Sequence, residues 1–286
     1  MLPKYFSQRS FFNNFYNWYL QLRIKIYNIF DIEKPSIKTP PSDYVLIYGD
    51  DFSQFNTDKW RLSQPWGDFH EYNLDWYYPT NEDSVFVNND GLVLELKHNP
   101  KTFIKSQLPS YRQSPTLPEQ WVSHWSGALM MSKFSFKYGW LEATIKLPKE
   151  KSQWPAFWTT GKNVWPPEID ILEAYSKNDP EKLHIKPNIH WGDTGDKTKR
   201  QYGAPTIDIK NPTDRFIQYA IHWTEDFIRF YYDGLLVQEC TNKEMLDYMG
   251  KDEHVIILNH GFKQTKIAPT GSQMIVKNIK LFQKEH

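Results

Sequence analysis

The sequence has a single cysteine, Cys240, so no disulfide can form within the chain. It has no run of about 18 apolar residues, the length from which a membrane-spanning helix is read. Its 34 Lys and Arg balance its 34 Asp and Glu, and a formal net charge of zero does not favour nucleic acid or an anionic membrane as a partner. A glycine-rich phosphate loop, a zinc-ligand spacing and a serine nucleophile elbow are also missing, which excludes the commonest phosphate, zinc and serine-hydrolase sites.

Aromatic side chains are in excess. They make up 16% of the residues and include 12 Trp. Several lie in polar stretches punctuated by glycine, such as Trp66-Gly67-Asp68 and Trp191-Gly192-Asp193. Flat amphipathic rings in such places serve either as core and loop anchors or as platforms for a sugar ring, whose faces are apolar and whose edges are polar. Composition alone leaves both interpretations open.

Residues 1–42 differ from the rest of the chain. Between residues 11 and 30 apolar side chains recur at steps of three and four, which predicts a helix. No uninterrupted apolar stretch with a small-residue cleavage site is present, so the segment does not have the pattern of a secretory signal. The helix packs against the main domain, lies on a membrane surface or forms a short oligomerising coil. The apolar residues of this stripe are Phe12, Phe15, Tyr19, Leu22, Ile26 and Ile29.

Short alternating segments separated by turn signals follow from residue 43 onward. Asp90-Gly91 and Asp233-Gly234 each stand between two such segments and indicate hairpins. Pro35, Pro40 and Pro41 separate this region from the helix before it. We therefore expect one all-β domain, a sandwich or barrel of residues 43–286, with residues 1–42 as a helical appendage and linker.

The stretch from Glu168 to Glu173 carries three carboxylates. Glu168 and Asp170 are two residues apart, so on a strand they share a face. Glu173 is five residues from Glu168, an odd spacing, and reaches the same face only if one bulge residue lies near Ile171-Leu172. Like charges along one strand face repel, so these residues are a poor choice as surface decoration.

A retaining glycosidase would use this arrangement, because it needs two carboxyl groups about 5–5.5 Å apart. With the bulge, the two glutamates are four strand steps apart, or roughly 13 Å between Cα atoms, a distance that two inward-leaning side chains can largely close. The pair also needs one ionised and one protonated member, and Asp170 between them can tune that balance. An acidic strand edge or a Ca²⁺ site are the alternatives that three carboxylates alone leave open.

The flanking residues resemble glycoside hydrolase family 16. Trp154-Pro155-Ala156-Phe157-Trp158, followed by Trp165-Pro166-Pro167 and the three carboxylates, is similar to the signature of that family in its bulged form, Glu-x-Asp-x-x-Glu. The resemblance covers about residues 44–283 and extends to Ile189-His190-Trp191 after the signature. It is of the laminarinase, agarase and carrageenase type.

This resemblance implies a concanavalin-like β-jelly-roll sandwich with a cleft across its concave sheet. It implies a retaining, endo-acting hydrolase of O-glycosyl bonds, with Glu168 as nucleophile, Asp170 as assisting carboxylate and Glu173 as acid/base. No cofactor is implied, and the partner is a polysaccharide, either β-glucan or galactan. The residues that the resemblance places along the substrate are Trp154, Trp158, Trp165, His190, Trp191 and Asn259.

The sequence departs from the family pattern in two places, and one is Leu258-Asn259-His260-Gly261, which differs from the more apolar version in laminarin-cleaving members. Many members bind a structural Ca²⁺ through an Asp of the last strand, and Lys277 stands there instead. An ammonium group cannot ligate Ca²⁺, so we expect no metal. A substrate of this type favours an extracellular, cell-surface or virion-associated location.

Functions other than hydrolysis remain open, and so does the role of one basic segment. The sandwich could be a catalytically weak sugar-binding or adhesion protein, or the same site could carry out transglycosylation. Lys197, Lys199 and Arg200 form either a solvated loop or a contact for a sulfated or uronic sugar.

Overall fold

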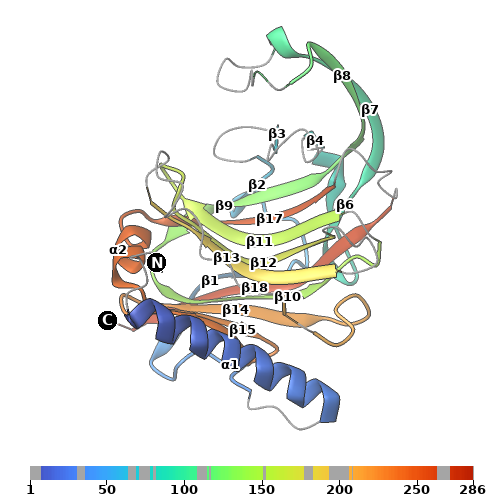
Figure 1. Cartoon of the computed structure of the whole chain (residues 1–286). Helices are drawn as coiled ribbons and strands as arrows, with labels where there is room; N and C mark the ends of the chain where they lie inside the picture. The colour runs from blue at the N-terminus through green and yellow to red at the C-terminus, as the bar shows by residue number, and fades with distance from the viewer. Residues whose placement is uncertain are drawn as a thin grey trace, which may run out of the picture.

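The computed structural model describes residues 8–30, 36–63, 69–70, 78–79, 82–107, 115, 117–150, 153–176, 183–192, 206–207, 209–262 and 271–285. Two antiparallel sheets stack on each other and confirm the predicted β-sandwich. Figure 1 shows helix α1 (Gln8–Phe30) against sheet A and the hairpin of β7 (Lys97–Ile104) and β8 (Gln120–Ser126) curving over the far side of sheet B.

Sheet A has the order β16-β15-β14-β10-β18-β6-β5, and β1 pairs with the same edge of β18 as β6 does. Its eight strands in the described part of the chain are β1 (Tyr44–Asp50), β5 (Val85–Asn88), β6 (Gly91–Glu95), β10 (Gly139–Lys146), β14 (Ile217–Trp223), β15 (Ile228–Tyr232), β16 (Leu235–Cys240) and β18 (Gln273–Lys284).

Sheet B has the order β13-β12-β11-β17-β9-β2. Its strands are β2 (Trp60–Arg61), β9 (Ala128–Phe136), β11 (Gln153–Gly161), β12 (Glu168–Ser176), β13 (Leu183–His190) and β17 (His254–Phe262). The smaller elements are β3 (Phe69–His70), β4 (Tyr78–Pro79), α2 (Lys243–Met249) and two short 3₁₀ turns, η2 (Glu82–Ser84) and η3 (Lys105–Gln107).

The main core lies between the sheets, and alternating side chains of the strands supply most of it. On β12, Ile169, Leu172 and Ala174 are buried in this core, and Ile185 and Ile189 of β13 lie beside them. The polar side chains between them, Asp170 and Glu173, face the other side of sheet B, called here its outer face. The strands that carry the carboxylates are anchored by apolar burial on one face and are available for chemistry on the other.

A β-bulge interrupts β12, as the odd spacing of the glutamates predicted. Trp158 of β11 pairs with Asp170, and the next pair joins Phe157 to Leu172, so Ile171 is the extra residue. The extra residue restores the phase of the alternation and turns Glu173 to the same face as Asp170.

Two residues elsewhere in the chain fit the bulge. Pro187 of β13 stands opposite it, between the pairs formed by Lys186 and Asn188, and a proline has no N–H to donate to a ladder. The carbonyl oxygen of Ile171 accepts a hydrogen bond of 2.9 Å from the hydroxyl of Tyr232, a buried residue of β15 in the opposite sheet. One hydroxyl from sheet A thus satisfies the backbone at the irregular point of sheet B.

Helix α1 packs on β16, the edge strand of sheet A, and confirms the predicted N-terminal helix. Leu20 and Ile24 are buried there. Among the described residues, no helix has the length and apolar character needed to cross a bilayer. The separation into residues 1–42 and 43–286 stays a prediction.

Lys277 is exposed on β18, with its ammonium nitrogen 5.8 Å from the centre of the Phe216 ring. The Lys277 ammonium group offers no oxygen ligand to Ca²⁺ and would repel it, and it already lies over an aromatic ring. The residues at this position therefore do not fit the structural Ca²⁺ that the family resemblance would imply.

Tyr232 and its neighbour Tyr219 offer a matched test of the bulge contact. Both are buried, and their ring centroids lie 4.9 Å apart, but the Tyr219 hydroxyl has no hydrogen-bond partner among the described residues. Tyr232→Phe should lower the free energy of unfolding by about 1–3 kcal/mol, because it removes the buried hydrogen bond to the Ile171 carbonyl. Tyr219→Phe should be close to neutral. Urea unfolding measures both, and equal losses would show that the bulge contact contributes nothing.

Candidate active site

Two rows of polar side chains face each other on the outer face of sheet B. Three carboxylates come from β12, and three nitrogen-bearing side chains come from β13, which is its partner at the edge of the sheet. Because the bulge takes up one residue, the two rows remain in register over their whole length. The pairs are Glu168 with His190, Asp170 with Asn188, and Glu173 with Lys186.

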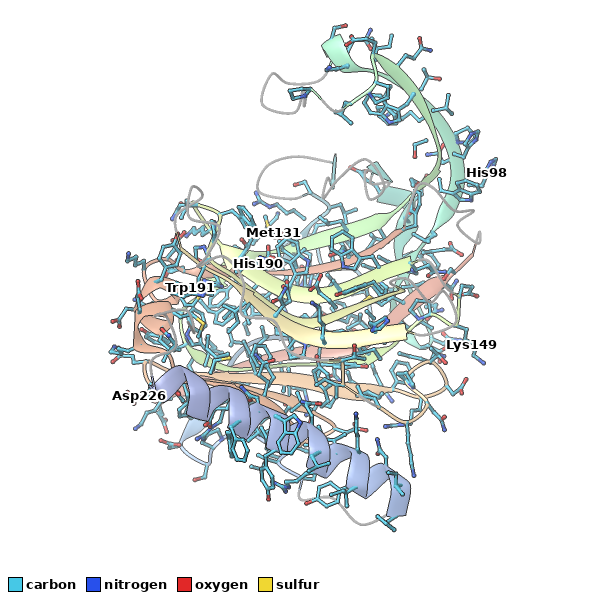
Figure 2. The ribbon with its side chains drawn as sticks, in the orientation of Figure 1. His98, Met131, Lys149, His190, Trp191 and Asp226 are labelled. Atoms are coloured by element: carbon cyan, nitrogen blue, oxygen red, sulfur yellow. The ribbon has the colours of Figure 1, made fainter. Side chains whose placement is uncertain are left out.

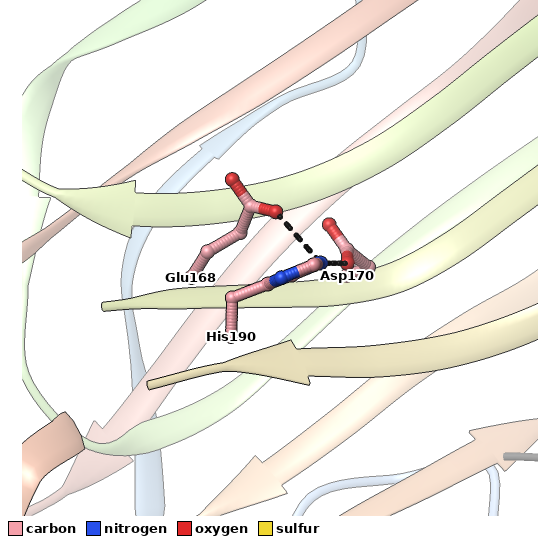
Figure 3. A group of neighbouring side chains, drawn as sticks. All are labelled: Glu168, Asp170 and His190. Carbon is pink, nitrogen blue, oxygen red and sulfur yellow. Dashed lines mark ion pairs between the residues drawn. The ribbon is translucent and has the colours of Figure 1, made fainter. Parts of the chain in front are cut away.

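His190 lies closest to the first two carboxylates (Figure 3). Its Nε2 atom is 3.4 Å from Oε1 of Glu168 and 3.5 Å from Oδ2 of Asp170. The side-chain amide nitrogen of Asn188 is 3.0 Å from the same ring nitrogen. Oδ2 of Asp170 is buried and has no hydrogen-bond partner among the described residues. Asn188 therefore contacts His190, and His190 lies beside a carboxylate pair that is not fully hydrogen-bonded.

Each glutamate is also held by one indole. Trp165 donates a hydrogen bond of 2.9 Å from Nε1 to Oε2 of Glu168. Trp154 donates one of 3.0 Å from Nε1 to Oε1 of Glu173. Trp165 is partly exposed and its ring centroid is 6.2 Å from that of His190. The two rings orient the carboxylates and keep aromatic surface beside them.

Burial and mutual repulsion perturb the carboxyl groups. Burial, and after it the charge of Asp170, raises the pKa of Glu168 well above the usual range, and the Trp165 hydrogen bond offsets part of that rise. Burial, and after it the charge of Glu173, raises the pKa of Asp170 in the same direction. Glu168 and Asp170 together therefore retain a proton at a pH where isolated carboxyl groups have lost theirs.

The same closeness would allow a cation. The ligand atoms of Glu168, Asp170 and His190 all lie within 4.8 Å of one another, a spacing that a metal ion could bridge. Two carboxylates and an imidazole can equally share a proton, as the raised pKa values of the acids indicate. The sequence prediction of no metal stays a prediction.

The structure separates the other predicted substrate residues. Trp158 and Asn259 are buried side by side on the outer face, where the Trp158 indole donates a hydrogen bond of 2.7 Å to Oδ1 of Asn259. Both belong to the same face as the carboxylates, since Trp158 pairs with Asp170, and Asn259 pairs with Ala156, which in turn pairs with Glu173. Trp191, next to His190 at the end of β13 (Figure 2), is buried in the main core and packs on Tyr248 of α2. The alternation that turns His190 outward sends Trp191 inward, so the structure does not bring it to the carboxylates.

Sequence reasoning missed Lys186 and Asn188. Both belong to the run Lys186-Pro187-Asn188-Ile189-His190, whose polar residues are two apart and share a face with His190. The alternation was readable, but only the register with β12 shows that Lys186 stands opposite Glu173. Lys186 is half-buried, with its ammonium nitrogen 5.5 Å from the centre of the Tyr175 ring. Lys197, Lys199 and Arg200 lie outside the described residues.

Residues 77–258, more than half of the chain, match the model of glycosyl hydrolases family 16. The chain belongs to this family. The strand pair β12–β13 lies inside the matched region. The Glu-x-Asp-x-x-Glu residues of this family member therefore sit on the bulged strand that the sequence predicted.

The chain is also similar to individual proteins of known name, among them two curated relatives and one protein of solved structure. The endo-1,3-1,4-beta-glycanase EglC of Rhizobium meliloti is 27% identical over 72% of this chain and 41% of its own length. A beta-1,3-glucan-binding protein of Penaeus monodon is 35% identical over 37% of this chain and 32% of its own length. The structure of this chain superposes on the crystal structure of LamAcat from Zobellia galactanivorans with a TM-score of 0.64 and 23% sequence identity. The superposition covers 83% of this chain and 97% of LamAcat. The chain thus spans only about a third to two fifths of these two curated relatives.

The raised pKa values predict how stability depends on pH. A carboxyl group with a raised folded-state pKa contributes stability that is full below its unfolded pKa of about 4 and is lost as the pH rises through the folded pKa. Asp170→Asn removes one such group and relieves Glu168 of its charge. The stability of this variant relative to the wild type should therefore increase as the pH rises from about 4 to 7.

Thermal unfolding at a series of pH values measures this difference. Asp226→Asn, at an exposed site in the β14–β15 turn (Figure 2), is the matched control, because it makes the same replacement of carboxylate by amide on sheet A. An Asp170→Asn difference that is constant across the pH range would contradict the crowded-carboxylate account.

Proposed function

We propose that this chain is a retaining, endo-acting glycoside hydrolase that cleaves a β-linked polysaccharide, with β-glucan as the favoured substrate. The observation that carries the proposal is the set of three carboxylates, Glu168, Asp170 and Glu173, on one face of the bulged strand. The names of curated relatives support β-glucan over galactan, since they include an endo-1,3-1,4-beta-glycanase and a beta-glucanase.

In the first step Glu168 attacks the anomeric carbon and Glu173 donates a proton to the departing glycosidic oxygen. The bond between the anomeric carbon and that oxygen breaks as the glycosyl ester on Glu168 forms. Glu168 must be ionised to attack, so the proton retained in the buried pair has to reside on Asp170 at that moment. The Trp165 hydrogen bond favours the ionised form of Glu168 and works in the same direction.

In the second step Glu173, now ionised, takes a proton from water, which attacks the anomeric carbon and releases Glu168. Lys186, opposite Glu173 on β13, is a cation that stabilises this ionised state. The Trp154 indole keeps the Glu173 carboxylate oriented through both steps. The partly exposed Trp165 ring provides an apolar platform for a sugar beside Glu168.

A glucan-binding protein without catalysis is the second candidate, because one relative bears that name. Binding alone gives no reason for a buried pair of carboxyl groups with raised pKa values. Such crowding costs stability and is typical of active sites. The two functions separate when binding and bond cleavage are measured on the same polysaccharides.

Glu168→Gln tests the nucleophile. The amide matches the carboxylate in shape but does not attack carbon, so reducing-end release from β-glucans should fall by at least about a thousandfold, or about 4 kcal/mol in activation free energy. Polysaccharide binding, measured by affinity electrophoresis, should remain. A wild-type chain that binds β-glucan but releases no reducing ends would favour the binding function. Activity of the variant within about tenfold of the wild type would remove Glu168 from the proposed role.

Glu173→Ala tests the acid/base. Polysaccharide should hardly react, because its leaving oxygen needs a proton, whereas an aryl β-glucoside oligomer with an acidic phenol should still form the glycosyl-enzyme. Azide needs no general base and fits the space left by the substitution, so it should restore turnover and yield a β-glycosyl azide. Trp154→Phe is the matched control, since it removes the indole that donates to Glu173 but keeps the Glu173 carboxylate, and azide should not raise its rate. An α-glycosyl azide would overturn the assignment.

A further inference from the structure

Helix α1 attaches to sheet A through an unusually polar face. The side-chain amide of Asn17 donates a hydrogen bond of 3.0 Å to the carbonyl of Glu239 and accepts one of 3.0 Å from the N–H of the same residue. The Gln21 amide donates a hydrogen bond of 2.7 Å to the carbonyl of Val237. These amides satisfy the free edge of β16 as a neighbouring strand would, and so protect an edge that could otherwise pair with another chain.

The opposite face of α1 is more apolar than the buried one. Large side chains on it are exposed by more than half, Phe15 and Trp18 at 57%, Phe30 at 69% and Ile29 at 73%. With 100° per residue, they lie on the side of the helix away from Asn17 and Ile24. Three further residues extend the same face between them, and we call the whole set the outward face of α1. These are Tyr19, Leu22 and Ile26.

A soluble helix normally buries its apolar face and exposes its polar one, and α1 does the reverse. Scattered exposed apolar side chains need no explanation, but a continuous stripe along a helix marks an interaction surface. The described contacts of the domain do not cover it, since the buried residues of α1 all belong to the other side.

The charges on α1 indicate which partner fits. The helix contains Arg9, Arg23 and Lys25 and has no Asp or Glu. By helical geometry Arg23 and Lys25 stand on the two flanks of the outward face. Apolar and aromatic side chains bordered by basic ones match the layered chemistry of a lipid surface, with acyl chains beneath anionic headgroups. A second copy of the helix would instead bring the same positive charges together.

We propose that α1 is an interfacial anchor that lies in the plane of an anionic lipid surface, with its outward face inserted and Arg23 and Lys25 at the headgroup phosphates. Trp18 and Tyr19 suit the boundary between headgroups and acyl chains. α1 lies on the sheet A side of the sandwich, whereas the carboxylates lie on the outer face of sheet B (Figure 1). An anchored molecule therefore turns its carboxylate face away from the lipid. This orientation gives the proposed polysaccharide hydrolase access to its substrate, but the anchoring itself does not depend on that function.

Vesicle flotation of the full chain tests the proposal. Wild-type protein should float with vesicles of phosphatidylcholine and phosphatidylserine, less with pure phosphatidylcholine, and less again at high salt. A variant with Trp18→Gln and Ile29→Gln should lose at least about tenfold of its partition to the mixed vesicles, because it removes two large apolar side chains from the inserted face. Its far-ultraviolet circular dichroism should not change, because both side chains are exposed.

The matched control carries Leu46→Gln and Val122→Gln, two substitutions of exposed apolar residues on β1 and β8, away from α1. Its flotation should equal that of the wild type. A wild-type chain that does not float, or a Trp18→Gln and Ile29→Gln variant that floats as well as the control, would overturn the proposal. A wild-type dimer in size-exclusion chromatography that this variant dissociates, with no vesicle binding, would assign the face to self-association instead.

Discussion

The extra residue in β12 is the constraint on which the site depends. Without Ile171 out of register, Glu173 would point into the core between the sheets, where a carboxylate could not be ionised at acceptable cost. The bulge turns Glu173 outward. The Ile171 carbonyl at the bulge accepts a hydrogen bond from the Tyr232 hydroxyl of the opposite sheet. Sheet A therefore takes part in the geometry of a site that lies entirely on the outer face of sheet B.

Placing three carboxylates on one face has an electrostatic cost that the surroundings only partly offset. Burial raises the pKa of Glu168 and of Asp170, and a neighbouring carboxylate raises each further, Asp170 acting on Glu168 and Glu173 acting on Asp170. His190 and the Trp165 indole lower the pKa of Glu168, and Lys186 lowers that of Asp170, but neither effect cancels the rise. The remaining rise in pKa suits the proposed chemistry, because a retaining mechanism needs neighbouring acids that differ in protonation. Stability is lost where the proposed chemistry is gained.

Much of this could be read from the sequence, and the failures have physical reasons. The odd spacing of Glu168 and Glu173 predicted the bulge. The proposed chemistry needs both glutamates on one face of the strand, and regular alternation would place them on opposite faces. The partner of the bulge could not be predicted, since Tyr232 is about sixty residues away and only the packing of the two sheets joins them. Trp191 was grouped with His190 by adjacency, although period-two alternation separates neighbours.

The N-terminal helix shows a second kind of limit. Its period was plain in the sequence, but the pattern left open whether the apolar stripe packs on the main domain, on a membrane surface or on another helix. Asn17 and Gln21 do not belong to that stripe, and they are the residues that attach the helix to β16. Helical periodicity gives the faces of a helix and not their partners, because an unpaired strand edge is satisfied better by amides than by apolar side chains.

The stereochemistry of the first-formed product tests the central claim most directly. If Glu168 attacks and Glu173 then activates water on the same side of the sugar, two inversions give net retention. Proton NMR recorded immediately after enzyme is added to a β-glucan oligosaccharide should show the β anomer of the new reducing end before mutarotation produces the α form. Initial appearance of the α anomer would contradict the account, because it would mean a single displacement by water, without a covalent bond to Glu168.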